Sequence, residues 1–262
     1  MRSSLYFFTF ASMITKSTIK LVQSLKQAKY RKEHRLFVAE GRKTVEELLN
    51  SSFTVTGLYA TEAFLQQFEI RHPLLETVST VQMEQMSGLD TPPGILAIAN
   101  IPERSPQLPL TDPFALVLDG IANPGNMGTI IRTAEWFGVS NIICSEDCVE
   151  IWNPKVIQAA MGSLFRVHVV SCDLELFLKQ EKAQGKAVYG ALLEGENLFK
   201  QEQWTEGVMV IGSESHGIRA HLLPFITHPI TIPRAMGSMT ESLNASIAAG
   251  IILSRWASQN NY

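Results

Sequence analysis

Six short apolar runs in the C-terminal half of this 262-residue chain constrain its fold more than any other feature. Stretches with helical periodicity separate the runs from one another. The runs are Ala115–Asp119, Asn141–Cys144, Val167–Val170, Ala187–Leu192, Val208–Ile211 and Pro229–Ile232. Strands that are apolar along almost their whole length and alternate with helices are typical of a parallel sheet covered on both faces. Because ligands of such sheets bind beyond the carboxyl ends of the strands, we expect the chemistry there.

The N-terminal part has a shorter pattern that predicts a separate small α/β domain over residues 13–100. A helical pattern begins at Met13, and strands and helices then alternate. The predicted strands are Leu36–Val38, Val55–Tyr59 and Gly94–Ala99, and the predicted helices between them are Arg42–Leu49 and Glu62–Phe68. Residues 101–113 contain four prolines and no amphipathic period, which predicts an extended linker. The second domain then covers residues 114–262.

Residues 1–12 form an extension with an apolar centre and one arginine. They resemble a weak signal peptide, but no convincing cleavage site follows them. Since the regular pattern begins at Met13, we expect this extension to be disordered, or Met13 to be a natural start.

The formal net charge of −3 conceals an uneven distribution of charge. Between Lys16 and Lys43, nine Lys or Arg residues stand against two acids, a balance of +7, whereas the balance from Ile101 onward is −5. A basic first part suits attraction to a nucleic-acid phosphate backbone. A solvated helix face that only keeps the chain soluble explains the same run equally well, so the charge pattern leaves both interpretations open.

Composition excludes several classes of protein. No apolar run reaches the roughly 18 residues needed to span a bilayer. Three cysteines, Cys144, Cys148 and Cys172, are too few for a disulfide scaffold, and neither they nor the six scattered histidines have metal-ligand spacing. We therefore expect core thiols, a cytoplasmic location, no membrane association and no metal.

The first strand of the second domain runs into a glycine turn and then a helix. Asn126 is expected to cap this helix, and Gly128 to permit close approach of another backbone. Arg132 lies off the apolar stripe of the helix. The spacing of a dinucleotide-binding glycine loop is missing, which argues against a nicotinamide-dependent oxidoreductase. A capped loop with a surface arginine is the simplest alternative interpretation.

Two later strand ends carry further polar residues. After the fifth strand, Gly212 and Gly217 frame Glu214, which predicts a backbone bend with free amide groups. After the sixth strand, a helix rich in small residues is expected to begin at Thr240 or Ser242 and to be buried against another element or subunit. Asn244 would then lie in its first turn against its helix propensity, which marks it as a functional candidate or a satisfied buried asparagine.

In this order, the three segments resemble the three motifs of the SpoU/TrmH group of the SPOUT methyltransferase superfamily. Asn126 and Arg132 fall on the first motif, the segment from Gly212 to Gly217 on the second, and Ile232-Pro233 with Glu241-Ser-Leu-Asn244 on the third. Residues 30–41 are similar to the start of the ribosomal-protein-like RNA-binding domain found upstream in many members. The loop between Pro233 and Ser242 is about two residues longer here than in many relatives, which leaves its shape open.

The resemblance implies a deep trefoil knot in the C-terminal domain, S-adenosylmethionine as the methyl donor, and a homodimer that methylates a ribose 2′-hydroxyl in RNA. Residues that it assigns to catalysis are Arg132, Asn126, Glu214, Ser242 and Asn244. Residues that it assigns to the cofactor are Leu192, Gly212, Ile232 and Leu243. The candidates for RNA contact in the basic segment are Lys26, Lys29, Arg31, Lys32 and Arg35.

The resemblance treats Arg132 as the residue nearest the ribose oxygen. Because the pKa of a guanidinium lies above about 12, the group stays charged at neutral pH. We therefore expect Arg132 to stabilise a developing alkoxide, with a role as base left open. The upstream domain favours ribosomal RNA as the substrate. Transfer RNA, methylation of a base, and a catalytically silent RNA-binding assembly factor are the alternatives.

Overall fold

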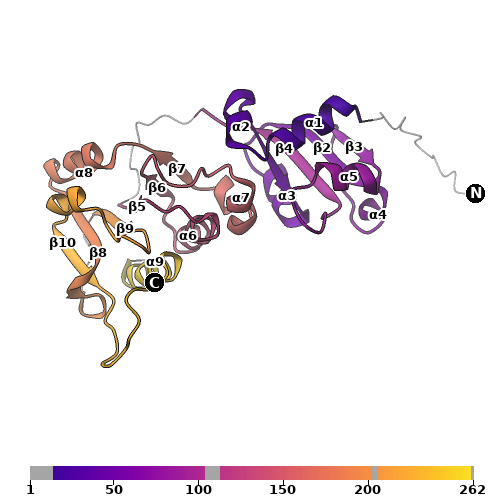
Figure 1. The fold of residues 1–262 in the computed structure, drawn as a ribbon. Helices are drawn as coiled ribbons and strands as arrows, with labels where there is room; N and C mark the ends of the chain where they lie inside the picture. Colours follow the sequence, from indigo (N-terminus) through magenta and orange to yellow (C-terminus); the bar gives the residue numbers. More distant parts are fainter. Residues whose placement is uncertain (1–13, 104–112, 202–203, 205, 261–262) are drawn as a thin grey trace, which may run out of the picture. The chain divides into compact units, whose positions relative to one another are not determined.

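The computed structural model describes residues 14–103, 113–201, 204 and 206–260. The chain divides into two compact units between Ile101 and Pro102 (Figure 1). The predicted extension 1–12 lies outside the described residues, as does most of the predicted linker.

The N-terminal unit is built on a four-stranded mixed sheet with the order β1-β4-β2-β3. β4 pairs antiparallel with both β1 and β2, and β2 pairs parallel with β3. The strands are β1 (Leu36–Glu40), β2 (Val55–Thr61), β3 (Leu75–Val78) and β4 (Ile95–Asn100). The helices are α1 (Lys16–Ser24), α2 (Ala28–His34), α3 (Arg42–Leu49), α4 (Glu62–Leu65) and α5 (Thr80–Met86).

The helical pattern that begins at Met13 forms two helices, α1 and α2, rather than one. β3 and α5 were not predicted, and one helix was predicted too long. β3 has only four residues and α5 only seven, so both are too short for a clear periodicity. The start of α5 nevertheless carries a legible signal, because Ser79 and Gln82 form a capping box. The helix expected over Glu62–Phe68 ends at Leu65 after a single turn.

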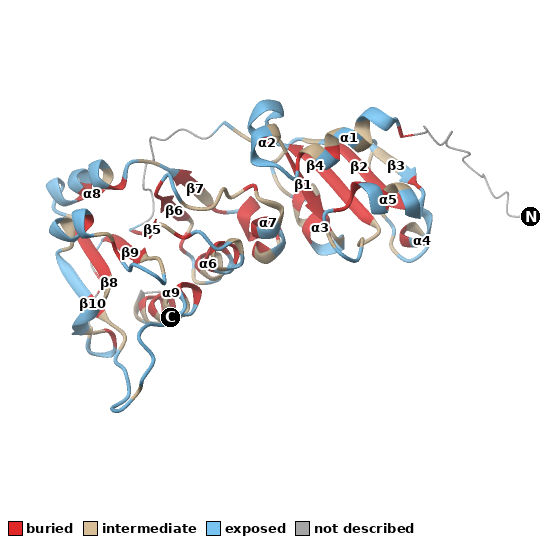
Figure 2. Ribbon diagram, in the orientation of Figure 1, coloured by how far each residue is buried: buried red, intermediate tan, exposed pale blue. Residues whose placement is uncertain are grey.

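The C-terminal unit contains a six-stranded sheet in which every strand pair is parallel, which confirms the expected α/β class and its parallel sheet. The strand order is β10-β8-β9-β5-β6-β7. The strands are β5 (Phe114–Asp119), β6 (Asn141–Cys144), β7 (His168–Ser171), β8 (Ala187–Asn197), β9 (Gly207–Gly212) and β10 (His228–Thr231). The α-helices are α6 (Pro124–Trp136), α7 (Pro154–Ala160), α8 (Leu174–Ala183) and α9 (Ala245–Asn260). β5, β6, the first five residues of β9 and the first four residues of β8 are buried, whereas the first two residues of β10 are exposed (Figure 2).

Helices cover both faces of the parallel sheet. Leu174 and Leu178 of α8 pack on one face against alternate residues of the strands, such as Val117 and Val210. α6 and α9 pack against each other, and α9 also contacts β9 (Figure 1). α7 lies directly on α6, where a Cβ atom at Gly128 would be only 2.6 Å from the Val156 carbonyl oxygen. The close approach expected at Gly128 is therefore confirmed. None of the described helices is long and apolar enough to cross a bilayer.

β8 is five residues longer than predicted, and its register with β10 is broken. Pro229 pairs with Gly190, but the next residue, Ile230, pairs with Glu196. Five residues of β8, 191–195, therefore have no paired residue in β10. The irregular segment lies at the carboxyl end of the sheet, where ligands of parallel sheets bind.

Candidate functional site

Three polar side chains from three separate segments meet beyond the carboxyl ends of the strands. The Asn126 amide donates to Glu214 Oε1, and the Asn244 amide donates to Glu214 Oε1 at 3.1 Å and to Asn126 Oδ1 at 3.0 Å. The Ala245 backbone N–H donates to the same Glu214 oxygen at 3.3 Å. We call Asn126, Glu214 and Asn244 the polar cluster. Each predicted motif contributes one residue to it.

Asn126 is free to join the polar cluster because another residue caps its helix. Asn123 Oδ1 accepts hydrogen bonds from the backbone N–H groups of Gly125, at 2.8 Å, and Asn126, at 3.1 Å. Pro124 occupies the first helical position, where its missing N–H costs nothing. The prediction that Asn126 caps α6 is therefore wrong, because Asn123 is the residue with extended backbone before the first turn.

Glu214 is held on a tight loop after β9. A Cβ atom at Gly212 would lie 2.0 Å from the Gly217 carbonyl carbon, so only glycine fits there. Gly217 also requires glycine, but for a different reason: its φ of +64° lies in the left-handed region that other residues rarely adopt. The loop also closes with a bridge between Ser213 and Gly217. The two glycines therefore create the bend that directs Glu214 toward the polar cluster.

Asn244 lies immediately before α9 rather than inside it. Its Oδ1 accepts from the Ser246 N–H at 3.0 Å, the Ser246 hydroxyl at 2.6 Å and the Ile247 N–H at 3.3 Å. A helix start at Thr240 or Ser242 is therefore wrong, and the poor helix propensity of Asn244 is explained by its capping role. Its oxygen caps α9 while its nitrogen binds the polar cluster.

Arg132 and Ser242 are exposed, and within the described residues no hydrogen bond joins either of them to the polar cluster. Six residues along a helix rotate Arg132 by about 240° from Asn126 and advance it by about 9 Å, which explains the separation. These two of the five predicted catalytic residues thus lie on the surface of this unit, and the polar cluster brings together the other three.

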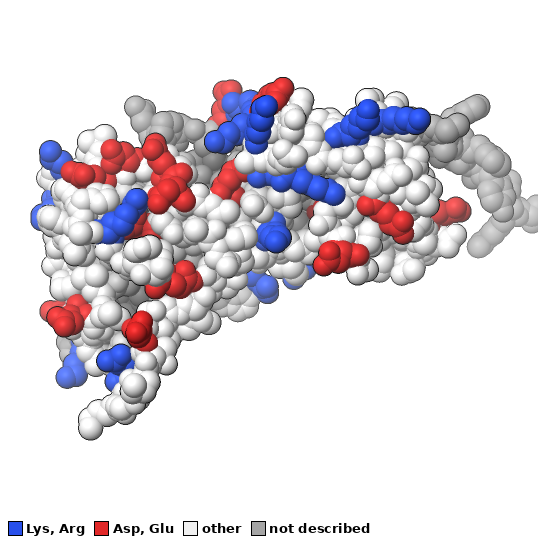
Figure 3. Space-filling model, in the orientation of Figure 1, with Lys and Arg blue, Asp and Glu red and all other residues white. Residues whose placement is uncertain are grey.

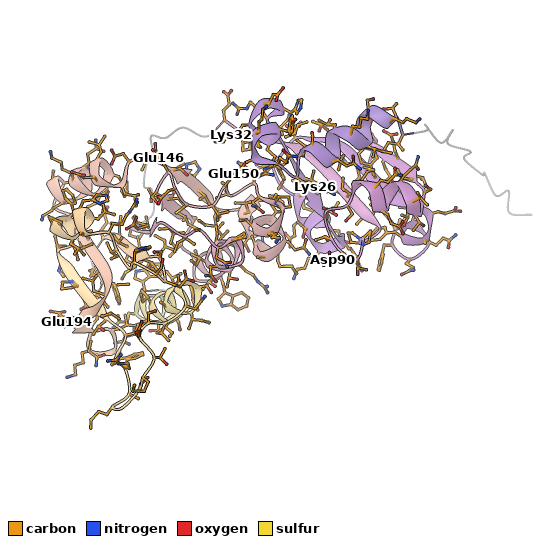
Figure 4. The ribbon with its side chains drawn as sticks, in the orientation of Figure 1. Lys26, Lys32, Asp90, Glu146, Glu150 and Glu194 are labelled. Atoms are coloured by element: carbon orange, nitrogen blue, oxygen red, sulfur yellow. The ribbon has the colours of Figure 1, made fainter. Side chains whose placement is uncertain are left out.

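The four predicted cofactor residues lie at the ends of three neighbouring strands and before α9. Leu192 belongs to the unpaired part of β8, Gly212 ends β9, and Ile232 follows β10. These three are partly buried, while Leu243 is 43% exposed. Glu194 marks the same end of β8 in Figure 4. Apolar side chains beside unpaired backbone fit a ligand that combines an apolar ring with polar edges, as an adenosyl group does.

One contact in this region was missed from the sequence. Asp119 at the end of β5 is buried and accepts from Arg219 twice, from its backbone N–H at 2.8 Å and from its Nε at 2.6 Å. Arg219 Nη2 lies 3.4 Å from Asp147. The hydrogen bond that Arg219 donates to the Asp119 carboxylate is the main cause that raises the pKa of Arg219. The pair fixes the segment after the Glu214 loop to the central strand, and an acidic strand end was its only sequence signal.

The five predicted RNA-contact residues differ in what they do. Arg31 is buried, with 2% of its surface exposed, and Nη1 donates to the Leu25 carbonyl at 2.8 Å. Lys26 Nζ donates to the Ser87 carbonyl at 2.6 Å, and Arg35 Nη2 to the Ile101 carbonyl at 3.3 Å.

The other two candidates, Lys29 and Lys32, are exposed on α2. Figure 3 shows Lys and Arg side chains over α1 and α2, and Figure 4 shows Lys32 well separated from Lys26. The prediction that Arg31 contacts RNA directly is wrong, because its side chain is buried and bonds to the Leu25 carbonyl.

Comparison with known proteins identifies the family of both units. The profile of the SpoU rRNA Methylase family matches residues 113–254, and that of the MRM3-like substrate binding domain matches residues 16–97. The chain belongs to the SpoU rRNA methylase family. The resemblance drawn from the three motifs is thereby confirmed. In this SpoU domain, one residue from each of the three motifs meets in the polar cluster.

Individual members of the family match along nearly the whole chain. The 23S rRNA (guanosine(2553)-2′-O)-methyltransferase RlmP of Bacillus subtilis (strain 168) is 29% identical over 90% of this chain and 94% of its own length. A solved structure from Porphyromonas gingivalis, assigned to the TrmH family of RNA methyltransferases, is 34% identical with a TM-score of 0.83, over 94% of this chain and 98% of its own. An AdoMet-bound rRNA methyltransferase from Sinorhizobium meliloti is 27% identical with a TM-score of 0.82, over 95% of this chain and 97% of its own.

Proposed function

We propose that this SpoU-family chain transfers a methyl group from S-adenosylmethionine to a ribose 2′-hydroxyl in ribosomal RNA. The observation that carries the proposal is the polar cluster, which brings the three family motifs together at the carboxyl ends of a parallel sheet. The names of full-length relatives, among them a 23S rRNA 2′-O-methyltransferase, favour ribosomal over transfer RNA.

S-adenosylmethionine supplies an electrophilic methyl group when it is bound. Leu192, Ile232 and Leu243 provide apolar surface for it, and Gly212 leaves backbone accessible at the end of β9. Two of these residues lie next to the polar cluster in the chain, since Gly212 is two residues before Glu214 and Leu243 is one residue before Asn244.

Proton loss from the ribose hydroxyl leaves negative charge on oxygen as the methyl group is transferred. Arg132 stabilises that charge, because its guanidinium is always protonated and directs several N–H groups outward. Ser242 and the polar cluster orient the groups around the reacting oxygen. No metal is required for such a displacement, which depends on alignment of the two reacting centres and on handling of the proton.

A homodimer and a trefoil knot are part of the proposal. Arg132 is exposed and six residues removed from Asn126 on the same helix, so a second copy of the chain is the natural source of the arginine beside each polar cluster. Exposed apolar side chains on α6 and α9, two helices that pack against each other, support association: Trp136 is 79% exposed and Ile247 is 54% exposed. The irregular pairing of β8 and β10 supports a threaded C-terminal segment.

The N-terminal unit is proposed to bind the RNA substrate. Its match to an MRM3-like substrate binding domain and the exposed lysines of α2 support this role. A cytoplasmic location completes the proposal, since the three cysteines are free thiols.

The proposal is tested by mapping 2′-O-methyl groups in RNA from cells with and without the gene. We expect one ribosomal RNA position to lose its methyl group in the deletion strain and to regain it on complementation. Loss of a methyl group from transfer RNA alone would show that transfer RNA, and not ribosomal RNA, is the substrate. An unchanged map in both RNA classes, together with no binding of S-adenosylmethionine in calorimetry, would favour the assembly-factor alternative.

A further inference from the structure

Helix α2 presents most of its surface to solvent (Figure 2). Of its seven residues, Arg31 is buried, Tyr30 is partly buried, and the other five are exposed. The Arg31 guanidinium donates to the Leu25 carbonyl at 2.8 Å and so ties the helix to the chain before it. The side of α2 that carries Arg31 therefore faces the domain, and the remaining sides face solvent.

Two aromatic rings lie one turn apart on the solvent-facing sides of α2. Tyr30 and His34 are separated by four residues, a spacing that places side chains next to each other on a helix. Their ring centroids are 6.3 Å apart and their planes are inclined by only 15°, so the rings are stacked. Because near-parallel rings have their faces turned the same way, a third planar group can stack on the pair.

The same helix brings positive charge to the aromatic pair. Lys29 Nζ lies 5.7 Å from the centroid of the Tyr30 ring, within the range of a cation–π contact. Lys32 is exposed one turn beyond Lys29 (Figure 4). Glu33 is the acid of the helix and stands against three basic residues, Lys29, Arg31 and Lys32. A ligand that suits both the rings and the charge combines a planar ring with negative groups.

We propose that Tyr30 and His34 form a stacking site for an unpaired base of the RNA substrate, with Lys29 and Lys32 binding the phosphates beside that base. The proposal rests on the proposed RNA-binding role of the N-terminal unit and specifies what that unit recognises. Tyrosine and histidine are among the side chains on which proteins stack single-stranded bases.

The aromatic pair is the feature that distinguishes unpaired RNA from duplex RNA. A base inside a double helix has both faces covered by its neighbours, whereas a base in a loop or a bulge has a free face. Lysines alone bind the phosphates of either form. Stacking is sequence-tolerant, because every base has an aromatic face. The site therefore takes an unpaired nucleotide without strong preference for its identity.

A purely structural role for the pair predicts a different result. Side chains four residues apart support a helix, so the two rings also stabilise α2. Loss of a helix-stabilising contact affects the binding of all RNA equally, through the fold of α2. Loss of a stacking site affects unpaired RNA alone.

The experiment measures binding of the full-length protein to two fluorescein-labelled RNAs in the absence of S-adenosylmethionine. One RNA is a short single strand of mixed sequence, and the other is the duplex that it forms with its complement. Tyr30→Leu should weaken binding to the single strand about tenfold and to the duplex less than about twofold, because stacking alone is removed. Tyr30→Phe keeps a ring and should bind both RNAs as the wild-type protein does.

A matched control removes an exposed ring elsewhere in the chain. Phe199 is 56% exposed in the C-terminal unit, and Phe199→Leu should leave binding of both RNAs unchanged. A direct signature comes from the ring protons of His34 in NMR spectra, identified by their loss in His34→Gln. The single strand should shift these signals upfield, because a stacked base shields them, and the duplex should not.

Equal weakening of both RNAs by Tyr30→Leu, or weakening of neither, would overturn the stacking site, as would unshifted His34 signals in the saturated single-strand complex. Failure of the wild-type protein to bind either RNA would overturn it together with the RNA-binding role of the N-terminal unit. None of these measurements involves methylation, so failure of the stacking site is distinguishable from failure of the proposed methyl transfer.

Discussion

The polar cluster of the C-terminal unit and the basic segment of the N-terminal unit were both derived from sequence, yet they differ in kind. Glu214 and Asn244 lie 88 and 118 positions from Asn126, and the fold alone brings them together. The basic residues are neighbours in the chain, and the fold separates them: Arg31 is buried while Lys29 and Lys32 are exposed. Polar residues at the ends of parallel strands converge because the strands end at one edge, whereas a charge run carries no such constraint.

The largest expected effect concerns the residue that stands outside the polar cluster. Arg132→Ala should lower kcat about 10²- to 10³-fold, because the developing oxyanion loses its charged donor. Affinity for S-adenosylmethionine, measured by calorimetry, should be unchanged. Thr129→Ala, an exposed position one turn earlier on α6, is the matched control and should retain activity. Full turnover by the Arg132 variant would remove this arginine from the chemistry.

Arg31 tests the distinction within the basic segment. Arg31→Ala should lower the free energy of unfolding of the N-terminal unit by about 3 kcal/mol, since it leaves the buried Leu25 carbonyl without this donor. Lys32→Ala, one residue along α2, should change stability by less than about 0.5 kcal/mol. Urea denaturation followed by circular dichroism measures both. Similar stability of the two variants would contradict the structural role of Arg31.

The exposed lysines should act on RNA rather than on stability. Lys29→Glu with Lys32→Glu should weaken RNA binding about tenfold and reduce its dependence on salt, because phosphate contacts are lost. Lys155→Glu with Lys179→Glu, two exposed lysines of the C-terminal unit, provides the matched charge change. Filter binding at several salt concentrations gives both quantities. An equal loss in both double variants would show that net charge, and no surface of the N-terminal unit, controls affinity.

The smallest expected effect is a pH-dependent one in the C-terminal unit. Arg166 Nε donates to Glu135 Oε1 at 2.6 Å, and this bond is the main cause that lowers the pKa of Glu135. The stabilisation is present above the ordinary Glu pKa of about 4.3 and is lost as the pH falls through the lower folded value. Because both side chains are partly exposed, Glu135→Gln should cost less than about 1 kcal/mol at pH 7 and almost nothing near pH 3. Thermal melts across this range measure the difference, and an equal cost at both pH values would contradict it.

The sequence was sufficient for the parallel sheet and for the residues of the polar cluster. Strand identity followed from apolar runs such as Asn141–Cys144, which matches β6 residue for residue. The role of each polar residue was harder to predict, because it depends on which of the neighbouring residues caps the N-terminus of the helix. Asn123 and Asn126 are both plausible caps, and only the backbone conformation at Asn123 distinguishes them.

Other features depended on contacts that sequence patterns do not contain. Burial of Arg31 requires the packing of α2 on its sheet, and the Asp119–Arg219 pair joins residues 100 positions apart. The break in register between β8 and β10 likewise follows from how two strands meet rather than from either strand. Such features need three-dimensional information, even where every participating residue is visible in the sequence.

The central claim is methyl transfer to a ribose oxygen, and one measurement tests it most directly. Purified protein, isotope-labelled S-adenosylmethionine and ribosomal RNA from an undermethylated source are incubated, and the RNA is digested to nucleosides for mass spectrometry. We predict the label on the ribose of a 2′-O-methylnucleoside with the wild-type protein and a signal at least about 10²-fold weaker with Arg132→Ala. Label on a base, or no label under conditions in which the protein binds S-adenosylmethionine, would contradict the account.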